Sequence, residues 1–237
     1  NESTGHNGNC YFCYQKFKSP LYLDYNKLES TLKKVGVLKR ATVMGGESLL
    51  NKDLVKIVSL VSKYTSDGVC LVTNGILLNK DIIAALKSAG LTEVAISVSS
   101  PKQYARRRDM ALMCKEIIPN TRINIPKCME SLNPTLLKSV LVDGFYCIVC
   151  EDLQGRYVVL QLPEGSITTG DVGYGFYDYE WNGHKFGVFG NYGKYNRSDI
   201  IITPLGNFCD WEKYCKAVDN TALVRQNSKI DNEQIVH

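Results

Sequence analysis

The hydrophobic residues in roughly the first 150 positions follow two alternating spacings. Short runs of aliphatic and β-branched residues are typical of buried strands, whereas apolar residues that recur every three or four positions indicate one face of a helix. The pattern predicts helices at residues 23–35, 54–61, 82–89, 102–118 and 134–142. It predicts strands at residues 40–44, 69–73, 94–98, 122–125 and 145–149. Repeated strand–helix units with short connections indicate a parallel sheet covered by helices.

The pattern changes in the last third of the chain, where glycine and aromatic residues become dense and helical spacing is lost. Asn182-Gly183 separates two aromatic segments, at 176–181 and 184–189, and this dipeptide suits the positive φ angles of a type I′ turn. A second hairpin is predicted from 200–202 into 208–209. We therefore expect an antiparallel β extension after the parallel sheet.

The predicted elements divide the chain into three parts. Residues 1–152 hold the strand–helix units, residues 153–216 hold the β-hairpins, and residues 217–237 form a polar tail with little apolar pattern. A chain of 237 residues with 44% hydrophobic residues suits one medium-sized domain with an appendage. The expected fold class is α/β.

Composition narrows the function classes only slightly. The formal charge of +4 is mildly basic, so it neither demands nor excludes a nucleic-acid partner. No apolar run approaches the roughly 20 residues that a membrane-spanning helix needs, and we expect a cytoplasmic protein without a membrane partner. The nine cysteines are odd in number and scattered, which favours thiols or metal sites in a reducing compartment over a disulfide framework.

A loop near the amino end carries the strongest chemical signal. It reads Thr4-Gly5-His6-Asn7-Gly8-Asn9-Cys10-Tyr11-Phe12-Cys13. Two thiolates three residues apart on a glycine-containing loop can hold one metal centre, and the imidazole of His6 offers a third donor. Because a single CxxC pair is a weak signal, the rest of the chain must decide its meaning.

Further polar motifs follow the predicted strands. They are Gly45-Gly46-Glu47, Thr73-Asn74-Gly75, Ser97-Val98-Ser99 and Arg122-Ile123-Asn124. In a parallel barrel the loops that follow the strands gather at one face, where cofactors and chemistry lie. We therefore expect these motifs and the cysteine loop to converge.

This combination resembles the radical S-adenosylmethionine (radical SAM) superfamily. The signature of that family is CxxxCxxC, with an aromatic residue before the last cysteine, and a GGE motif after the second strand. The corresponding residues here are His6-x-x-x-Cys10-x-x-Cys13, with Phe12 as the aromatic residue, and Gly45-Gly46-Glu47. The resemblance implies a partial (β/α) barrel of the radical SAM type.

The resemblance also implies two cofactors, a 4Fe–4S cluster and S-adenosylmethionine. In the family, three ligands hold three irons, and the amino and carboxylate groups of S-adenosylmethionine chelate the fourth. An electron from the cluster cleaves the sulfonium bond, and the resulting 5′-deoxyadenosyl radical abstracts hydrogen from a substrate. A peptide, an RNA or a small molecule would be the substrate here, and a reductant such as flavodoxin or ferredoxin would supply the electron.

The family's site positions can be transferred residue by residue. His6, Cys10 and Cys13 match the cluster ligands, and Phe12 matches the residue that packs near the adenine. The other matching positions are Gly45, Gly46 and Glu47 for the methionine ammonium, Ser97 and Ser99 for the ribose or the methionine carboxylate, and Arg122 and Asn124 for the same carboxylate.

Two departures from the family pattern affect the expected function. A histidine ligand raises the reduction potential of an iron–sulfur cluster, whereas reductive cleavage of a sulfonium needs a very low potential. Only residues 1–5 precede His6, where the family places its first barrel strand. We expect that strand to be missing or to come from elsewhere, for example from a partner chain that completes the barrel.

Three functions therefore remain open from the sequence. The favoured interpretation is a radical SAM enzyme. The second is a catalytically degenerate relative, kept as a structural or interaction component of a larger assembly. The third is a zinc module built on His6, Cys10 and Cys13, which would leave the Gly-Gly-Glu motif without a role.

The remaining chemical features are expected to be structural. Cys147 and Cys150 lie on a predicted strand, where residues three apart point to opposite faces, so they are interpreted as core thiols. Cys209 and Cys215 have too few neighbouring cysteines for a complete auxiliary cluster. The arginine run at 106–108 is interpreted as a solvated helix face.

Overall fold

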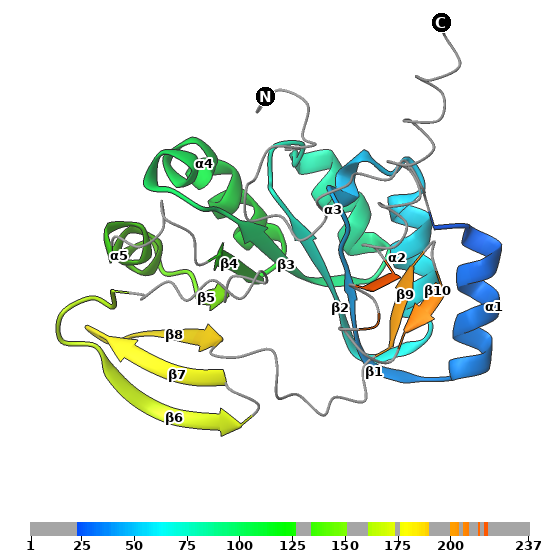
Figure 1. Ribbon diagram of the computed structural model, residues 1–237. Coiled ribbons are helices and arrows are strands. Elements are labelled where there is room, and N and C mark those ends of the chain that lie inside the picture. The colour runs from blue at the N-terminus through cyan, green and yellow to red at the C-terminus, as the bar shows by residue number, and fades with distance from the viewer. Residues whose placement is uncertain are drawn as a thin grey trace, which may run out of the picture.

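The computed structural model describes residues 23–126, 134–150, 161–173, 176–189, 200–203 and 206–208, together with residues 213, 216 and 217. Its centre is an eight-stranded sheet with the strand order β1-β2-β3-β4-β5-β8-β7-β6 (Figure 1). The sheet is open, since β1 and β6 lie at its two ends and do not pair with each other. The α/β class and the partial barrel predicted from the sequence are confirmed.

The amino-terminal part of the sheet consists of parallel strand–helix units. Its strands are β1 (Leu38–Val43), β2 (Thr65–Thr73), β3 (Leu91–Ser97), β4 (Asn120–Pro126) and β5 (Cys147–Cys150). Its helices are α1 (Tyr25–Val35), the 3-10 helix η2 (Ser48–Leu50), α2 (Leu54–Ser62), α3 (Lys80–Ser88), α4 (Pro101–Ile117) and α5 (Pro134–Val142). Neighbouring strands from β1 to β5 pair in parallel. Helices α2 to α5 link these strands in succession, as the predicted periodicity requires.

Local sequence signals set the helix boundaries. Asp24, Asn79 and Ser100 each accept a hydrogen bond from a backbone N–H in the first turn of α1, α3 and α4, which stabilises those helix starts. Gly36 ends α1 at φ +82°, a conformation that glycine adopts without strain.

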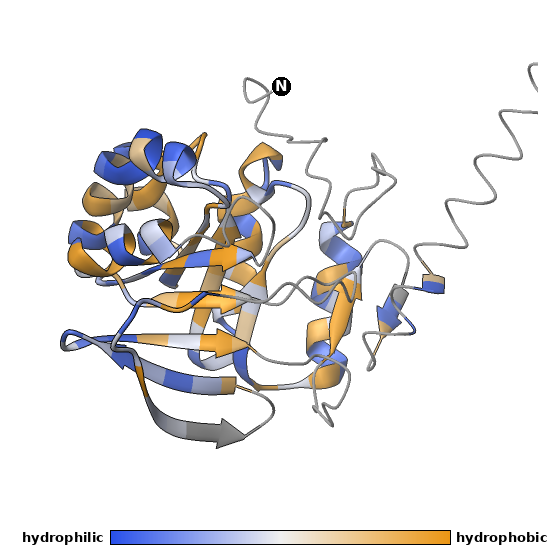
Figure 2. Cartoon of the chain, turned by 60° about the vertical axis from the view of Figure 1, so that its left-hand side comes forward, coloured by the Kyte–Doolittle hydropathy of each residue, from blue (hydrophilic) through white to orange (hydrophobic). Residues whose placement is uncertain are grey.

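The hydrophobic core lies between the helices and one face of the sheet. Alternate strand residues such as Leu71, Ile96 and Ile123 are fully buried beneath helix residues such as Val58 and Leu86. Figure 2 shows hydrophobic residues along the central strands and hydrophilic residues on the outer turns of the helices. Because side chains alternate along a strand, the residues between these core positions point to the opposite face. We call that opposite face the inner face, and it includes Cys70, Glu93, Ala95, Arg122 and Asn124.

The antiparallel extension continues the same sheet. It comprises β6 (Ile167–Gly173), β7 (Phe176–Trp181) and β8 (His184–Phe189), and β8 pairs in parallel with β5. The β7–β8 hairpin turns at Asn182 and Gly183, both with positive φ, as the sequence predicted. The sheet thus runs across the predicted domain boundary at residue 152, and the boundary itself stays a prediction.

A second hairpin links the late part of the chain to its first described helix. β9 (Ile201–Thr203) pairs antiparallel with β10 (Gly206–Phe208), which confirms the second predicted hairpin. The Asn207 amide donates a hydrogen bond to the Thr31 hydroxyl of α1 at 3.5 Å, and Ile202 packs against the core. Within the described ranges, none of the helices is long and apolar enough to cross a bilayer.

An ion pair ties α4 to the end of α5. The Asp143 carboxylate accepts hydrogen bonds from Arg108 Nε at 2.7 Å, from Arg108 Nη2 at 2.6 Å and from the Tyr104 hydroxyl at 2.7 Å. The Arg108 hydrogen bonds lower the pKa of Asp143, against the opposing effect of burial. A depressed pKa in the folded state means that this contact stabilises the protein above the ordinary pKa of an aspartate and is lost as pH falls through the folded pKa.

We expect Asp143→Asn to lower the free energy of unfolding at pH 7 by about 2 kcal/mol, because hydrogen bonds to a charged group are lost. The difference from the unmodified chain should shrink below about pH 4, where the carboxylate becomes protonated. Urea unfolding at pH 7 and pH 3 measures both effects. Asp109→Asn is the matched control, since its side chain is 99% exposed and lies 3.9 Å from the same arginine. Equal losses in the two variants would contradict the prediction.

Candidate functional site

The predicted polar motifs converge at the carboxyl ends of the parallel strands. Thr73 at the end of β2 pairs with Ile96 of β3, and Ser97 at the end of β3 pairs with Asn124 of β4. Gly45, Gly46 and Glu47 begin two residues after Val43, the last residue of β1, at the same edge of the sheet. Strands β1 to β4 are neighbours in the sheet (Figure 1), so these residues belong to adjacent strand ends at one edge.

Glu47 holds the loop after β1 against the end of β2. Its side chain is buried, and Oε1 accepts hydrogen bonds from the Thr73 hydroxyl at 2.6 Å and from the Leu49 backbone N–H at 3.1 Å. Oε2 accepts one from the Asn74 backbone N–H at 2.8 Å. The carboxylate also caps the short helix η2. Three protein donors thus fix both oxygens of this side chain.

Hydrogen bonds within the segment Thr73-Asn74-Gly75 fix the conformation in which it contacts Glu47. The Gly75 N–H donates to the Thr73 hydroxyl at 3.1 Å, and the Ile76 N–H donates to the Asn74 side chain at 2.8 Å. Gly75 has φ +78°, and a Cβ at this position would lie 3.0 Å from Ile96 Cγ2, so any larger residue would be strained. The sequence placed this segment after a predicted strand but did not indicate its role as the partner of Glu47.

Ser97 and Ser99 lie over the start of α4. The Ser99 backbone N–H and hydroxyl both donate to Gln103 Oε1 at 3.0 Å. Arg107 Nη1 donates to the Ser97 carbonyl at 3.4 Å and to Gln103 Oε1 at 3.3 Å. Arg107 is buried, so the prediction of a solvated arginine face is wrong for this residue. The helical period explains the error. At about 3.6 residues per turn, three consecutive residues point in different directions and cannot all lie on one face.

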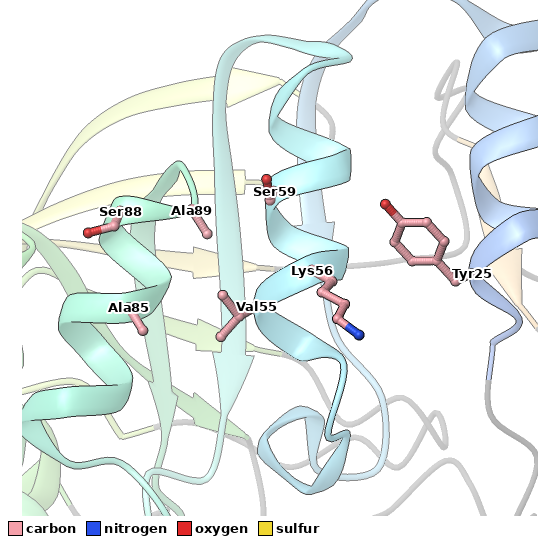
Figure 3. Close-up of a pocket in the computed structure, with 7 residues that line it drawn as sticks. All are labelled: Tyr25, Val55, Lys56, Ser59, Ala85, Ser88 and Ala89. Atoms are coloured by element: carbon pink, nitrogen blue, oxygen red, sulfur yellow. The ribbon is translucent and has the colours of Figure 1, made fainter.

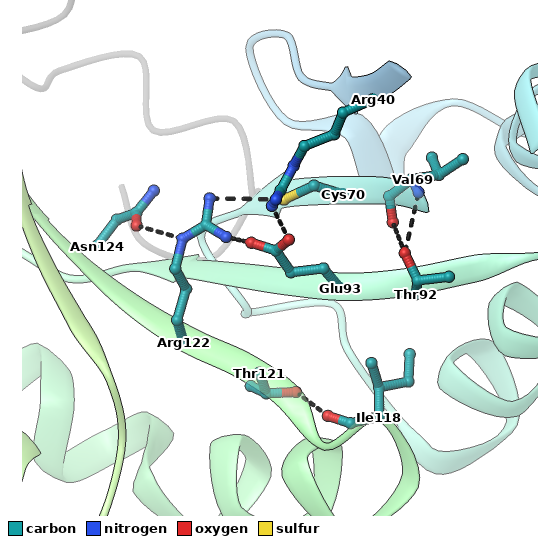
Figure 4. Close-up of polar contacts among 9 residues, drawn as sticks. All are labelled: Arg40, Val69, Cys70, Thr92, Glu93, Ile118, Thr121, Arg122 and Asn124. Carbon is teal, nitrogen blue, oxygen red and sulfur yellow. Dashed lines mark hydrogen bonds and ion pairs between the residues drawn. The ribbon is translucent and has the colours of Figure 1, made fainter. Parts of the chain in front are cut away.

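Arg122 and Asn124 lie on the inner face and contact each other (Figure 4). Arg122 Nε donates to Asn124 Oδ1 at 3.2 Å. Since arginine has donors only, this hydrogen bond assigns the oxygen of the Asn124 amide to the Arg122 side and turns its NH₂ group away. The NH₂ group is nearer the carboxyl edge than Arg122, because Asn124 stands two residues later on β4.

The guanidinium of Arg122 belongs to a charged network that the sequence did not reveal. Arg122 Nη1 and Arg40 Nη2 both form ion pairs with Glu93, one with each carboxylate oxygen. Arg122 Nη2 also lies 3.6 Å from Cys70 Sγ. Burial raises the pKa of the Cys70 thiol, and the neighbouring Arg122 opposes that rise. The available signal for Glu93 was that it is the only charged residue in the β3 segment.

A surface hollow of about 420 Å³ lies elsewhere, between α1, α2 and α3 (Figure 3). It is lined by Tyr25, Val55, Lys56, Ser59, Ala85, Ser88 and Ala89. Its lining on α3 lies at the carboxyl end of the helix, just before β3 begins. On α2 the lining begins at the amino end of the helix instead, so the hollow lies along the helices and on the other side of the sheet from the inner face.

The amino-terminal part of the predicted site lies outside the described residues. His6, Cys10, Cys13 and Phe12 belong to that part, and Cys209 and Cys215 near the other end of the chain also lie outside the described residues. Across the described ranges, no group of three His, Cys, Asp or Glu side chains is arranged to hold a metal ion. Cys147 is buried in the core, as predicted, whereas the side chain of Cys150 is not described.

Comparison with known sequences identifies a single family. Residues 3–118 match the model of the radical SAM superfamily. A probable GTP 3′,8-cyclase of Thermoplasma volcanium is 37% identical over 164 residues, which are 67% of this chain and 45% of the relative. An uncharacterised protein of Methanocaldococcus jannaschii is 32% identical over 140 residues, 59% of this chain and 45% of the relative. The chain thus spans less than half the length of these relatives.

Solved structures show the same fold at lower sequence identity. SuiB of Streptococcus suis bound to its precursor peptide SuiA superimposes with a TM-score of 0.51. That match has 19% identity and covers 61% of this chain and 36% of SuiB. At this level of identity the similarity is one of fold.

Proposed function

Because the chain belongs to the radical S-adenosylmethionine superfamily, we propose that it is an enzyme that uses a 4Fe–4S cluster to cleave S-adenosylmethionine reductively. The cluster would be bound by His6, Cys10 and Cys13, and hydrogen would be abstracted from a substrate. The observation that carries the proposal is the ordered edge of β1 to β4, where the motifs matched to cofactor binding lie side by side. A reductant such as flavodoxin or ferredoxin would supply the electron.

The described residues fit the methionine end of S-adenosylmethionine. With both Glu47 oxygens engaged by protein donors, Glu47 is proposed to position the loop, and the Gly45 and Gly46 carbonyls to accept hydrogen bonds from the ammonium. A backbone carbonyl is a strong acceptor for such a donor. A Cβ at Gly45 would meet no atom within 4 Å, so the described residues leave room beside this peptide.

The carboxylate and ribose would be shared between β3 and β4. The NH₂ group of Asn124 is a donor that suits the methionine carboxylate, and Arg122 would act by fixing the orientation of this amide. Ser99 donates its hydroxyl proton to Gln103, so its oxygen suits a ribose hydroxyl donor better than a carboxylate. Ser97 lies beside Asn124 in the register and is proposed to contact the same end of the cofactor. Phe12 is proposed to pack near the adenine.

One specific observation favours a second function. The first ligand position holds His6, and an imidazole ligand raises the potential of an iron–sulfur cluster. The alternative is therefore a chain that keeps the radical SAM fold as a structural or interaction component, with a partner chain completing the barrel.

The test is anaerobic reconstitution with iron and sulfide, followed by EPR spectroscopy of the dithionite-reduced chain. A 4Fe–4S signal that changes on adding S-adenosylmethionine, together with formation of 5′-deoxyadenosine, is the result expected of the enzyme. A chain that assembles no cluster would contradict the enzyme proposal and support the alternative.

A further inference from the structure

The inner face of the sheet continues from the parallel strands onto the antiparallel extension. In the register, Asn124 of β4 pairs with Ile148 of β5, and Ile148 pairs with Gly187 of β8. Gly187 pairs in turn with Asp178 of β7. These residues form one row across neighbouring strands (Figure 1). With strands about 4.8 Å apart, the row extends roughly 15 Å from Asn124 to Asp178.

Two phenylalanines of the extension give this part of the inner face an apolar surface. Phe189 is buried, yet among the described residues it lies outside the core cluster, which its strand neighbours Phe186 and Val188 join from the other face. Its ring meets the half-buried ring of Phe176 edge-on, with 5.6 Å between the ring centroids. Phe176 also lies on the face that carries Ile148, so an apolar ligand group can contact it from that side.

A tyrosine and an aspartate form a hydrogen bond beside these rings. The Tyr146 hydroxyl donates to Asp178 Oδ1 at 3.3 Å. The contact passes over β8 at Gly187, where a Cβ would lie 2.8 Å from the Tyr146 hydroxyl and would also collide with the Phe176 ring. Burial, together with the nearby Asp178 carboxylate, raises the pKa of Tyr146 to about 12. The hydroxyl therefore remains a hydrogen-bond donor at neutral pH.

The Asp178 carboxylate keeps one oxygen and its charge for a ligand. Within the described part of the chain, Oδ2 has no hydrogen-bond partner and the carboxylate forms no ion pair. Arg122 also acts electrostatically on Tyr146, but its guanidinium is already paired with Glu93. Asp178 is half-buried, and partial burial lowers the effective dielectric constant, so it attracts a cation more strongly than a fully exposed carboxylate does.

We propose that the substrate carries an ammonium group beside an aromatic or apolar moiety, and that Asp178 binds the ammonium while Phe176 contacts the apolar moiety. An ammonium group has donors only, which matches the free acceptor oxygen of Asp178. Tyr146 is a positioning residue, because its hydrogen bond orients the carboxylate. Naming this amine as the substrate rests on the proposed enzyme function, whereas the binding of the amine rests only on the described residues.

The test is an NMR titration of the full chain, labelled at its isoleucine methyl groups, with benzylammonium chloride and, separately, with benzyl alcohol at constant ionic strength. The Ile148 methyl signal reports binding beside Gly187. Asp178→Asn should weaken benzylammonium binding about tenfold, the size expected when one partly screened ion pair is lost. Binding of benzyl alcohol should not change in this variant, which also shows that the apolar surface is still formed.

Two further variants separate the roles of the ring and the hydroxyl. Phe176→Leu should weaken the binding of both probes about fivefold, because each loses its contact with an aromatic ring. Tyr146→Phe should weaken benzylammonium binding about threefold and leave benzyl alcohol unchanged, because a carboxylate without its neutral hydrogen bond is less well oriented. Glu180→Gln is the matched control, since Glu180 lies on the same face of β7 and pairs in the register with the exposed Lys185.

The matched carboxylates separate a specific site from general attraction to a negative surface. Equal weakening by Asp178→Asn and Glu180→Gln would overturn the proposal, and so would benzyl alcohol binding as tightly as benzylammonium to the unmodified chain. Phenylalanine amide presents the same two groups as a peptide amino terminus. If it binds more tightly than benzylammonium, the substrate is a peptide, and the reverse order indicates a small amine. Amine binding without 5′-deoxyadenosine formation would refute the enzyme proposal and leave this site standing.

Discussion

Replacing Glu47 with glutamine is expected to lower the free energy of unfolding by about 2 kcal/mol and to weaken S-adenosylmethionine binding more than about tenfold. The stability loss follows from the three donors that converge on this carboxylate, from Thr73, Leu49 and Asn74. A glutamine keeps one acceptor oxygen and places an NH₂ group against one of those donors. At least one buried donor then lacks an acceptor.

The loss of binding would follow because Glu47 fixes the peptide that carries Gly45 and Gly46. Without the hydrogen bond to the Asn74 N–H, the loop after β1 is held less firmly against the end of β2. Urea unfolding measures the first effect, and equilibrium dialysis of S-adenosylmethionine against the reconstituted chain measures the second. Asp53→Asn is the control, because this carboxylate is 56% exposed and pairs only with Lys56 among the described residues. Unchanged S-adenosylmethionine binding in a destabilised Glu47→Gln chain would show that Glu47 is purely structural.

Much of the fold follows from the sequence because the hydrophobic residues of buried helices and strands recur at regular spacings. The five parallel strands were expected within a few residues of their positions, and α5 was expected at its observed bounds. β6 was missed because its register shifts twice, between Thr168 and Gly170 and between Asp171 and Gly173. Each shift inserts an unpaired residue, which breaks the alternation that marks a strand.

The site was less predictable because motifs identify positions and not partners. The sequence placed Glu47 at the ammonium, but the structure shows its carboxylate hydrogen-bonded to the neighbouring strand and loop. The sequence also placed Arg122 beside Asn124, and in the structure the two side chains contact each other. The role of Glu93 depends on Arg40, which is 53 positions earlier in the chain and separated from it by β2. No local pattern encodes such a pairing.

The largest change in chemistry is expected from His6→Cys. A thiolate donates more electron density to iron than an imidazole does, and clusters with histidine ligands have higher potentials than all-cysteine clusters by amounts on the order of several hundred millivolts. We therefore expect the reduction potential of the reconstituted cluster to fall by on the order of 200 mV in this variant. The rate of 5′-deoxyadenosine formation should rise at least about tenfold, because the sulfonium is cleaved by the electron that the cluster supplies.

Redox-poised EPR and quantification of 5′-deoxyadenosine measure the two effects, and Cys10→Ala is the matched control. Loss of Cys10 should abolish the cluster in both backgrounds, because fewer than three protein ligands would then remain in the predicted set. If the unmodified chain assembles no cluster and His6→Cys restores one, the chain has kept the fold but lost the ability to bind the cluster. The degenerate alternative then holds. If both chains assemble the cluster with the same potential, His6 is not a ligand. The third iron would then be bound by a residue outside the motif, and the proposed ligand set would be wrong.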